Sequence, residues 1–476
     1  MATTYQPDRR RVAALTALVG SLVITTMAER AAAHVKWFSD FDFRDPPRSF
    51  GEIVDTGFVV ALVIAAVVIG ALPALDRWLE TNAAYQRVNG WLVERRHYSI
   101  DVVRYSMAAV LVITWASRAL LTPELAEPAD WVGWIELGLA ILLLTGVGNR
   151  IAGAGLIALW LIGVFEYGAF HMLDYVHIIG IGGFLILRTE DRDDVRGLAL
   201  PVLYVAVGFS LMWLGFEKLV YPDWSFAILD TRPILRLGLP AELFLDAAAF
   251  VEIGLGFLLI IGLLGRPLAL TITGVFIVTT LVFGRTEVIG HTPVHAALVV
   301  FLLHGPGSTY PAPIAIHRDL QARTAFAAVN FALLTLLTGV LYTAAARVQF
   351  DDAVAEQGPK PAPIDAGPAA PTVRSVERET TPTGTDVVVE LDGWRFVAPT
   401  TDGAAVVTAP DPDEGPPTEG YGVITVDGRT VARLDDDRSP LWEDVDGDAF
   451  LHLFTVDGRE VQVDGEPLRL PIDLSE

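Results

Sequence analysis

The chain has 476 residues, of which 52% are hydrophobic, yet its formal net charge is −23 and it contains no cysteine. A sequence without cysteine excludes disulfides, thiolate nucleophiles, iron–sulfur clusters and cysteine-ligated zinc. Any redox chemistry therefore requires a bound cofactor, or a metal held by His, Asp and Glu. The acidic balance argues against nucleic acid as a partner, because a negative surface repels phosphate.

The negative charge is concentrated at one end of the chain. Residues 351–476 hold 28 of the 57 acidic residues and 9 of the 34 basic ones. The preceding 350 residues are nearly neutral and apolar, which is typical of a membrane protein, whereas the acidic tail is typical of a solvated domain. We interpret its acidity as a sign of a halophilic source, since a run of charges is more often a solvated face than a binding tail.

Apolar segments long enough to cross about 30 Å of hydrocarbon recur before the tail. We predict eleven spans, near 12–28, 56–75, 100–121, 131–147, 151–168, 172–187, 198–220, 242–264, 268–284, 291–304 and 324–346. Arginine-rich loops alternate with acidic, proline-rich loops, and this alternation predicts a cytoplasmic amino terminus. An odd number of spans then places the tail outside the cell, on a multi-pass protein of the cell membrane.

The first span has two interpretations. Three arginines, an apolar run and Ala31-Ala32-Ala33 are typical both of a signal anchor and of a cleavable signal peptide. Removal of residues 1–33 would leave His34 as the new amino terminus. The aromatic and charged residues 34–43 that follow are predicted to lie at the membrane interface or to form a lid over polar groups.

Two segments in the middle of the chain repeat one another. Trp134-Ile135-Glu136-Leu137-Gly138-Leu139 aligns without a gap with Phe250-Val251-Glu252-Ile253-Gly254-Leu255. The same register pairs Gly146 with Gly262, Arg150 with Arg266 and, after a two-residue slip, His177 with His295. Apolar matches arise by chance, but a shared Glu, Gly and Arg at one spacing indicates a duplicated module. Each copy is predicted to contain four helices, so both enter the membrane in the same direction.

Ionisable residues inside the predicted spans are the candidate functional groups, because a charge in hydrocarbon is costly unless it is paired. The catalytic candidates are Glu136, His177, Glu252 and His295, and the candidates for cofactor binding are Arg118, Asp174 and Lys218. His291 and His295 are four residues apart, a spacing at which two imidazoles can bind a metal ion. Glu166, Glu217 and Asp246 also fall inside predicted spans.

Three interpretations of these residues remain open. In the first they lock the bundle, with Glu136 paired to Arg118 and Glu252 paired to Lys218. In the second, His and Glu exchange protons with a quinone or another small molecule bound in a pocket. In the third, His177 and His295 hold a metal or a haem.

Each predicted copy, with its Trp-Ile-Glu-Leu-Gly or Phe-Val-Glu-Ile-Gly segment and a third helix rich in small residues, resembles the DoxX-like membrane family. Residues 208–219, at the start of the second copy, show the same resemblance. Members of that family have been tied to thiosulfate–quinone oxidoreduction and to membrane redox complexes. The resemblance implies a quinone-linked oxidoreductase subunit whose partners are a quinone or a redox protein. The alternative is a transporter or a scaffold.

The tail begins with a segment rich in Pro, Ala, Thr and Gly, and residues 348–385 are predicted to be a disordered linker. After it, apolar and polar residues alternate with a period of two. Asp-Gly dipeptides at 392, 427, 457 and 464 separate these runs, which predicts antiparallel hairpins.

The predicted fold is an all-α polytopic membrane protein of about eleven transmembrane helices, with two tandem parallel four-helix bundles and a C-terminal all-β soluble domain. The predicted domains are a signal anchor or cleavable signal at 1–33, an external loop, second helix and cytoplasmic loop at 34–98, the first DoxX-like copy at 99–190, the second at 197–305, the final transmembrane helix at 322–347, the linker at 348–385 and the extracellular acidic β domain at 386–476. That domain would bind a partner in the scaffold alternative.

Overall fold

The computed structural model describes residue 36, residues 41–231, 233–236, 238–283, 285–305 and 312–360, and strands between 364 and 472. The predicted signal segment 1–33 lies outside these residues. The chain forms two compact units. The first comprises Met1–Trp37, Pro47–Pro222 and Glu242–Gln349, and the second comprises Phe38–Pro46, Asp223–Ala241 and Phe350–Glu476.

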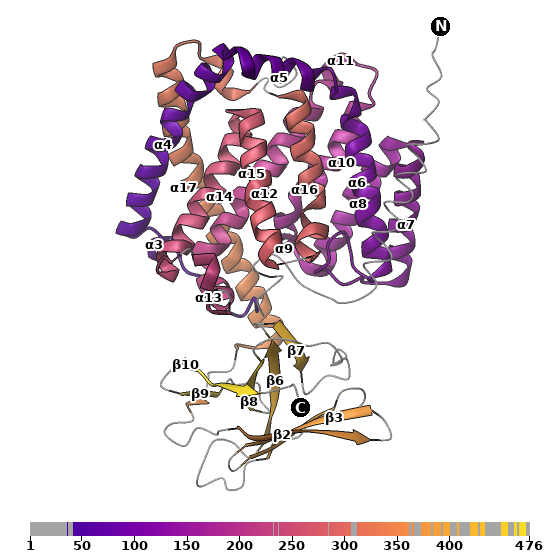
Figure 1. Ribbon diagram of the computed structural model, residues 1–476, viewed down its shortest axis with the longest axis vertical. Helices are drawn as coiled ribbons and strands as arrows, with labels where there is room; N and C mark the ends of the chain where they lie inside the picture. Colours follow the sequence, from indigo (N-terminus) through magenta and orange to yellow (C-terminus); the bar gives the residue numbers. More distant parts are fainter. Residues whose placement is uncertain are drawn as a thin grey trace. The chain divides into compact units, whose positions relative to one another are not determined.

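The first unit is a bundle of α-helices (Figure 1). Its elements are α3 (Phe50–Ile53), α4 (Thr56–Thr81), α5 (Ala83–Val93), η1 (Arg96–Tyr98), α6 (Ser99–Ala116), α7 (Asp130–Thr145), α8 (Asn149–Tyr167), α9 (Ala169–Met172), η2 (Leu173–Tyr175), α10 (Val176–Arg188), α11 (Asp193–Arg196), α12 (Ala199–Val220), α14 (Ala241–Ile261), α15 (Gly265–Phe283), α16 (Arg285–His304), η4 (Pro313–Ile316) and α17 (Leu320–Gln357).

Within the described part of the chain, eight helices are long and apolar enough to cross a membrane. They correspond to α4, α6, α8, α10, α12, α14, α16 and α17, some of them extended by neighbouring short helices. The predicted total was eleven. The span at 12–28 lies outside the described residues, the span at 131–147 is the 16-residue α7, and the span at 268–284 is α15, with a shorter apolar stretch at Gly265–Thr280. Pro293 lies inside α16 without ending it.

Two polar side chains define the ends of α4, the first fully described span. The Asp55 side chain accepts the Phe58 N–H at 2.7 Å and so begins the helix. Asn82 ends it and begins α5, where its side chain accepts the N–H groups of Ala84 and Tyr85. Such caps satisfy backbone donors that a helix terminus leaves unpaired. Between the caps α4 is apolar on nearly every face, as a lipid-facing helix must be.

The helices of the two predicted copies pack in a closed pattern. In the first copy α6 packs against α7 and α8 against α10, and in the second α15 packs against α16. Between the copies, α10 packs against α12 and α16 against α6. The last helix of each copy therefore contacts the first helix of the other. This is the arrangement expected when two similar units meet about an axis along the membrane normal.

Aligned residues have the same structural role in both predicted copies. Gly146 (φ 73°) and Gly262 (φ 69°) are both left-handed and follow α7 and α14, a conformation that suits glycine. Arg150 donates to the Thr189 carbonyl at 2.7 Å, just after α10. Arg266 donates to the Leu302 carbonyl at 2.7 Å, near the end of α16. These parallels support the duplication, which stays a prediction.

Basic residues gather at one end of the bundle. Arg95 and Arg96 lie between α5 and α6, and Arg192 and Arg196 lie at α11. In Figure 1 α5 and α11 are at the same end of the first unit, whereas α3 and α9 are at the opposite end. This asymmetry underlies the predicted cytoplasmic orientation of the arginine-rich loops. The side of the membrane on which the tail lies stays a prediction.

The second unit joins two connections of the membrane bundle to the tail. It contains α13 (Pro222–Thr231) and η3 (Pro233–Arg236), both between α12 and α14. Asp45, from the loop before α3, accepts hydrogen bonds from Trp224 at 3.0 Å and from Lys360 at 2.6 Å. The Phe41 ring packs 5.6 Å from Trp224. The loop before α3, the α12–α14 connection and the chain after α17 therefore meet within the second unit.

The boundaries after the last span differ from the predicted ones. Helix α17 continues to Gln357 and not 347, because no helix breaker occurs before Gly358 (φ 80°) and Pro359. Strand β2 (Val373–Thr381) lies inside the predicted linker 348–385. Composition predicted disorder there, but two Val and two Thr residues, which favour strands, lie in this segment, and it pairs with β3.

The described residues of the tail form strands (Figure 1). These are β1 (Ile364–Asp365), β2 (Val373–Thr381), β3 (Gly384–Leu391), β4 (Trp394–Pro399), β5 (Val407–Thr408), β6 (Glu419–Val426), β7 (Arg429–Arg433), β8 (Ala449–Thr455), β9 (Val461–Val463), β10 (Glu466–Pro467) and β11 (Arg469–Ile472). One sheet has the order β11-β8-β6-β5-β4-β3-β2 with β7 beside β6, and a smaller one has the order β1-β9-β10.

Three of the predicted Asp-Gly hairpins are flanked by paired strands. Leu391 pairs with Trp394 on either side of the dipeptide at 392, and Val426 pairs with Arg429 on either side of that at 427. Val463 pairs with Glu466 around the dipeptide at 464. A two-residue loop that favours positive φ at both positions is the shortest connection between antiparallel strands, which explains this placement.

A close crossing of α12 and α14 depends on glycine. A Cβ added to Gly208 would lie 2.6 Å from the Gly256 carbonyl oxygen. We expect Gly208→Ala to force the two helices apart and to lower stability by about 1–3 kcal/mol. Thermal unfolding of the purified protein tests this. Gly274→Ala on α15, where a Cβ meets no atom within 4 Å, is the matched control and should leave the melting temperature unchanged.

Candidate functional site

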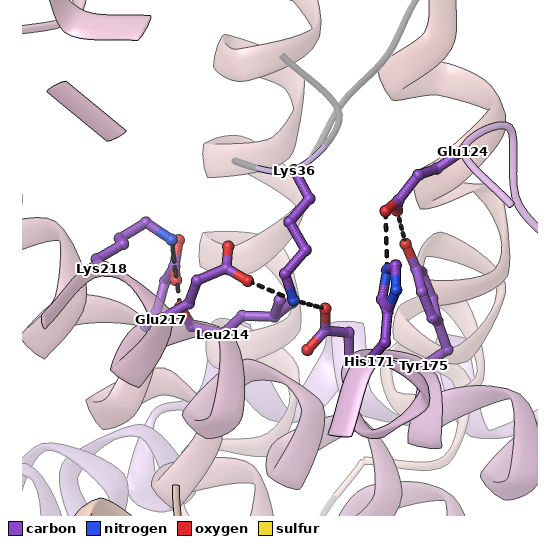
Figure 2. Close-up of polar contacts among 9 residues, drawn as sticks. Lys36, Glu124, His171, Tyr175, Leu214, Glu217 and Lys218 are labelled. Carbon is purple, nitrogen blue, oxygen red and sulfur yellow. Dashed lines mark hydrogen bonds and ion pairs between the residues drawn. The ribbon is translucent and has the colours of Figure 1, made fainter. Parts of the chain in front are cut away.

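A buried lysine lies between two carboxylates in the membrane unit (Figure 2). The Lys36 Nζ atom is 2.7 Å from Asp174 Oδ2 and 2.8 Å from Glu217 Oε2. All three side chains are only 1% exposed, so water does not screen them and their attraction is strong. We call these three residues the lysine triad.

The triad combines three separate parts of the chain. Lys36 precedes the first described helices, Asp174 lies in η2 at the start of α10, and Glu217 lies in the last turn of α12. The tight 3₁₀ turn of η2 ends the α9 segment and directs Asp174 inward. Because α10 and α12 belong to different predicted copies, the triad lies where the two copies meet.

A second polar group lies beside the triad in Figure 2. Glu124, from the connection between α6 and α7, is 2.8 Å from His171 Nε2 and accepts a hydrogen bond from the Tyr175 hydroxyl. Burial favours the neutral carboxyl, but His171, Tyr175 and Lys36 outweigh it and hold the pKa of Glu124 below its ordinary value. The result is a carboxylate, an imidazole and a phenol in one buried chain of proton-exchanging groups.

Glu252 and Lys218 form the ion pair that the interlocking interpretation predicted. Lys218 Nζ is 2.7 Å from Glu252 Oε2 and also lies 3.5 Å from the Leu214 carbonyl oxygen (Figure 2). The pair joins α12 to α14 within the second copy. Their side chains are 16% and 28% exposed, so this pair is less enclosed than the lysine triad.

The corresponding pair predicted in the first copy, Glu136 with Arg118, is wrong. Glu136 is fully buried and accepts the Leu121 N–H at 2.7 Å and the Thr114 hydroxyl at 3.0 Å. Arg118 is exposed and pairs with Asp130 and Glu127. Both Arg118 (φ 54°) and Leu121 (φ 60°) are left-handed, so the chain turns sharply after α6 and carries Arg118 away from Glu136.

His177 presents its ring to the interior without a fixed partner. Its backbone N–H donates to Ser210 Oγ at 3.0 Å, which joins α10 to α12. Neither ring nitrogen has a hydrogen-bond partner among the described residues, although the side chain is buried. Its ring lies 6.2 Å from that of Tyr175, and it is close enough to His291 to interact electrostatically.

His291 and His295 flank an aromatic ring. His291 stacks on Phe276 at 4.2 Å and is paired with Glu287, whereas His295 meets the edge of the same ring at 5.7 Å. In the part of the chain that the structure describes, no group of three or more His, Cys, Asp or Glu residues could hold a metal ion. The predicted metal pair therefore has no third protein ligand of these types within that part.

Among the described residues, the acid and the histidine proposed as catalytic candidates in each copy do not pair with each other. Glu136 bonds to Thr114 and Leu121 and not to His177, and Glu252 bonds to Lys218 and not to His295. Sequence reasoning instead missed Lys36, Glu124 and His171. Lys36 lies in a segment predicted to be interfacial, and Glu124 lies in a connection between spans.

Asp174 is the predicted residue that the structure places in the lysine triad. The sequence predicted it only as a candidate for cofactor binding. Glu217, an acid beside Lys218 near the end of an apolar span, was the feature of the sequence that could have indicated a buried cluster of acids and lysine. A partner 138 residues away in the chain could not be inferred from that signal.

Comparison with known proteins identifies one segment of the chain. A family model described as DoxX matches residues 200–285, whereas no curated protein and no solved structure matches the chain. The matched residues include α12, α14 and α15, in the second copy. Residues 200–285 thus carry the DoxX similarity that the resemblance predicted, and the apolar helices indicate an integral, multi-pass membrane protein.

Loss of the Lys36 charge should destabilise the bundle strongly. Lys36→Met leaves two buried carboxylates without their cation, and we expect a loss of about 3–5 kcal/mol. Adding Asp174→Asn and Glu217→Gln removes the uncompensated charges, so the triple variant should recover most of that loss. Thermal unfolding of wild type, Lys36→Met and the triple variant measures this recovery. A triple variant no more stable than Lys36→Met would contradict the charge argument.

The two roles open to Glu136 predict different outcomes. If Glu136 only holds the turn after α6, Glu136→Gln keeps an acceptor for Leu121 N–H and should cost less than about 1 kcal/mol. Glu136→Leu leaves that donor unpaired and should cost about 1–3 kcal/mol. A Glu136→Gln protein that unfolds like wild type but loses the quinone-linked redox activity that the resemblance implies would instead favour a catalytic role.

Proposed function

We propose that this DoxX-like protein is a quinone-linked redox subunit whose proton-exchanging pocket lies near the outer surface of the membrane. The observation that supports it best is the buried group His171–Glu124–Tyr175, with Glu124 bonded to both others, beside the lysine triad. Groups that exchange protons inside hydrocarbon are costly to keep, so their presence favours a functional role. Subunits of this kind take electrons from a redox protein partner.

His177 fits a quinone head group better than the other candidates do. A quinone takes up two electrons and two protons when it is reduced to a quinol, and its carbonyl oxygens accept hydrogen bonds. The two ring nitrogens of His177 have no hydrogen-bond partner among the described residues, and a buried donor without an acceptor is unfavourable. The imidazole could donate to such an oxygen, and Tyr175 lies next to it.

The group His171–Glu124–Tyr175 would then pass protons from the connection between α6 and α7. Because Glu124 is ionised at neutral pH, it can accept a proton from His171 or Tyr175 and hold the orientation of both groups. Of the other candidates, we assign Glu136 and Glu252 to holding the bundle together. His295, beside Phe276, and Arg118, which is exposed, carry no proposed contact with the quinone.

A transporter is the second candidate, and the position of the lysine triad favours it. In many transporters, ionisable groups lie where repeated units meet, and the units move against each other around them. Lys36, Asp174 and Glu217 lie at the contact between α10 and α12, the junction of the two predicted copies. The two candidates differ in whether a redox cofactor is required.

The acidic tail is proposed to lie outside the cell and to dock a partner protein. Its strands and net acidity support a folded, solvated domain suited to high salt. The arginine-rich connections favour a cytoplasmic position for their end of the bundle and so support the predicted orientation. A protease added to intact cells should remove the tail if this orientation is right, and should leave it intact if the tail is cytoplasmic.

Quinone binding tests the main proposal directly. Protein purified from its own membranes should retain quinone, extractable by solvent and measurable by absorbance, at about one molecule per chain. We expect His177→Phe to lower this content at least about tenfold, because a lost hydrogen bond to a buried oxygen weakens binding. His304→Phe, a buried histidine bonded to Ser99, is the matched control and should retain quinone.

Wild-type protein that neither retains added quinone nor supports its reduction would refute the redox proposal. Uptake of a solute into vesicles by the same protein would then support the transporter.

A further inference from the structure

The surroundings of the Lys36 ammonium resemble a ligand site. Besides the two carboxylates, the Phe170 ring centroid lies 5.5 Å from Nζ, within the range of a cation–π interaction. Phe170 also contacts Tyr342 at 5.2 Å and Trp213 at 5.8 Å, and these two rings lie 4.5 Å apart. The Lys36 ammonium therefore contacts two carboxylates and one aromatic ring, and two further rings pack against that ring.

The charges in this cluster do not balance. Two carboxylates face one ammonium, and Asp174 Oδ1 has no hydrogen-bond partner among the described residues. Trp213 Nε1 and the Tyr342 hydroxyl also have no hydrogen-bond partner among the described residues, and both side chains are at most 2% exposed. Buried polar atoms are nearly always paired in native proteins. These three atoms thus offer bonding capacity that Lys36 alone does not use.

The described walls of the cluster come from three parts of the membrane bundle. Phe170 and Asp174 come from the α9–η2 turn, Trp213 and Glu217 from α12, and Tyr342 from α17. Those elements are packed helices of the membrane bundle. Lys36 comes from a part of the chain before α3, outside these three parts.

We propose that Phe170, Asp174, Trp213, Glu217 and Tyr342 form a binding pocket for a primary ammonium ligand, and that Lys36 is its internal competitor. We call these five residues the ammonium pocket. Carboxylates supply charge and hydrogen-bond acceptors, and the rings supply a polarisable wall, which together favour an organic cation over a metal ion. An external ligand binds when Lys36 leaves the pocket. This inference is independent of quinone binding.

The Lys36→Ala variant in full-length protein tests the pocket directly. Alanine removes three methylenes and the ammonium, so propylammonium replaces the missing group atom for atom. We expect propylammonium to raise the melting temperature of the variant, and neutral n-propanol to leave it unchanged. Isothermal titration should give binding at least about tenfold tighter than to wild type, where tethered Lys36 competes at an effective concentration in the millimolar range.

A matched control separates a ligand pocket from an ordinary ion pair. Lys218→Ala removes a lysine that faces one carboxylate, Glu252, with no aromatic ring within cation–π range in the part of the chain that the structure describes. Propylammonium should not stabilise that variant. Adding Glu217→Gln to Lys36→Ala should weaken propylammonium binding at least about tenfold, because half of the negative charge is lost.

Several outcomes would overturn the proposal. The first is a folded Lys36→Ala protein that binds propylammonium no better than it binds propanol. The second is a Lys218→Ala control that propylammonium stabilises as much as it stabilises Lys36→Ala. If Lys36→Ala does not fold alone, it is purified in propylammonium or in propanol, with Lys36→Arg as the folding control. Recovery only in propylammonium supports the pocket. Recovery in neither, while Lys36→Arg folds, refutes it.

The ammonium group could belong to a soluble amine or to an ethanolamine lipid headgroup. Lys36→Ala is therefore placed in nanodiscs of phosphatidylcholine, with or without phosphatidylethanolamine, and melted with and without propylammonium. Stabilisation by phosphatidylethanolamine supports a pocket open to lipid. Stabilisation by propylammonium alone supports a pocket for a soluble amine. Stabilisation by neither refutes the proposal.

Discussion

The ammonium of Lys36, held between Asp174 and Glu217, is the interaction on which the membrane unit depends most. A single charge in hydrocarbon is unfavourable, and two buried acids without a cation would repel each other and the bilayer. Lys36 satisfies both acids at once because it reaches the point where α10 and α12 meet. The same contact connects the segment before α3 to two helices far away in the chain, and so helps to define the bundle as one body.

A second close contact in the bundle, the crossing of α12 and α14, depends on the approach of two backbones at glycine. Gly208 and Gly256 let α12 and α14 cross closely, and α14 in turn packs its Phe257 ring 5.4 Å from Phe331 of α17. Without a hydrophobic driving force between helices in lipid, such close packing and a few polar contacts must supply the association energy. The polar clusters are therefore part of the stability of the fold as well as candidates for its chemistry.

Local patterns predicted the helices and their ends well, whereas partners in space were predicted poorly. The spans, Gly146 and Gly262, and the Lys218–Glu252 pair all follow from spacing within a few turns or from one adjacent helix. Glu136 was assigned to Arg118 because both lie close in sequence, but the turn after α6 carries Arg118 out to solvent. The DoxX resemblance rested on local residues too, and it was confirmed over residues 200–285.

The sequence by itself determined that the chain crosses the membrane repeatedly, that its acidic tail is separate, and that its ionisable groups must be buried in pairs. Hydropathy, charge asymmetry and residue spacing are properties of the chain alone, so they can be read without coordinates. Only the tertiary structure decided which groups pair. Lys36, Asp174 and Glu217 come from three distant segments, and their contact follows from the packing of whole helices, which no local pattern encodes.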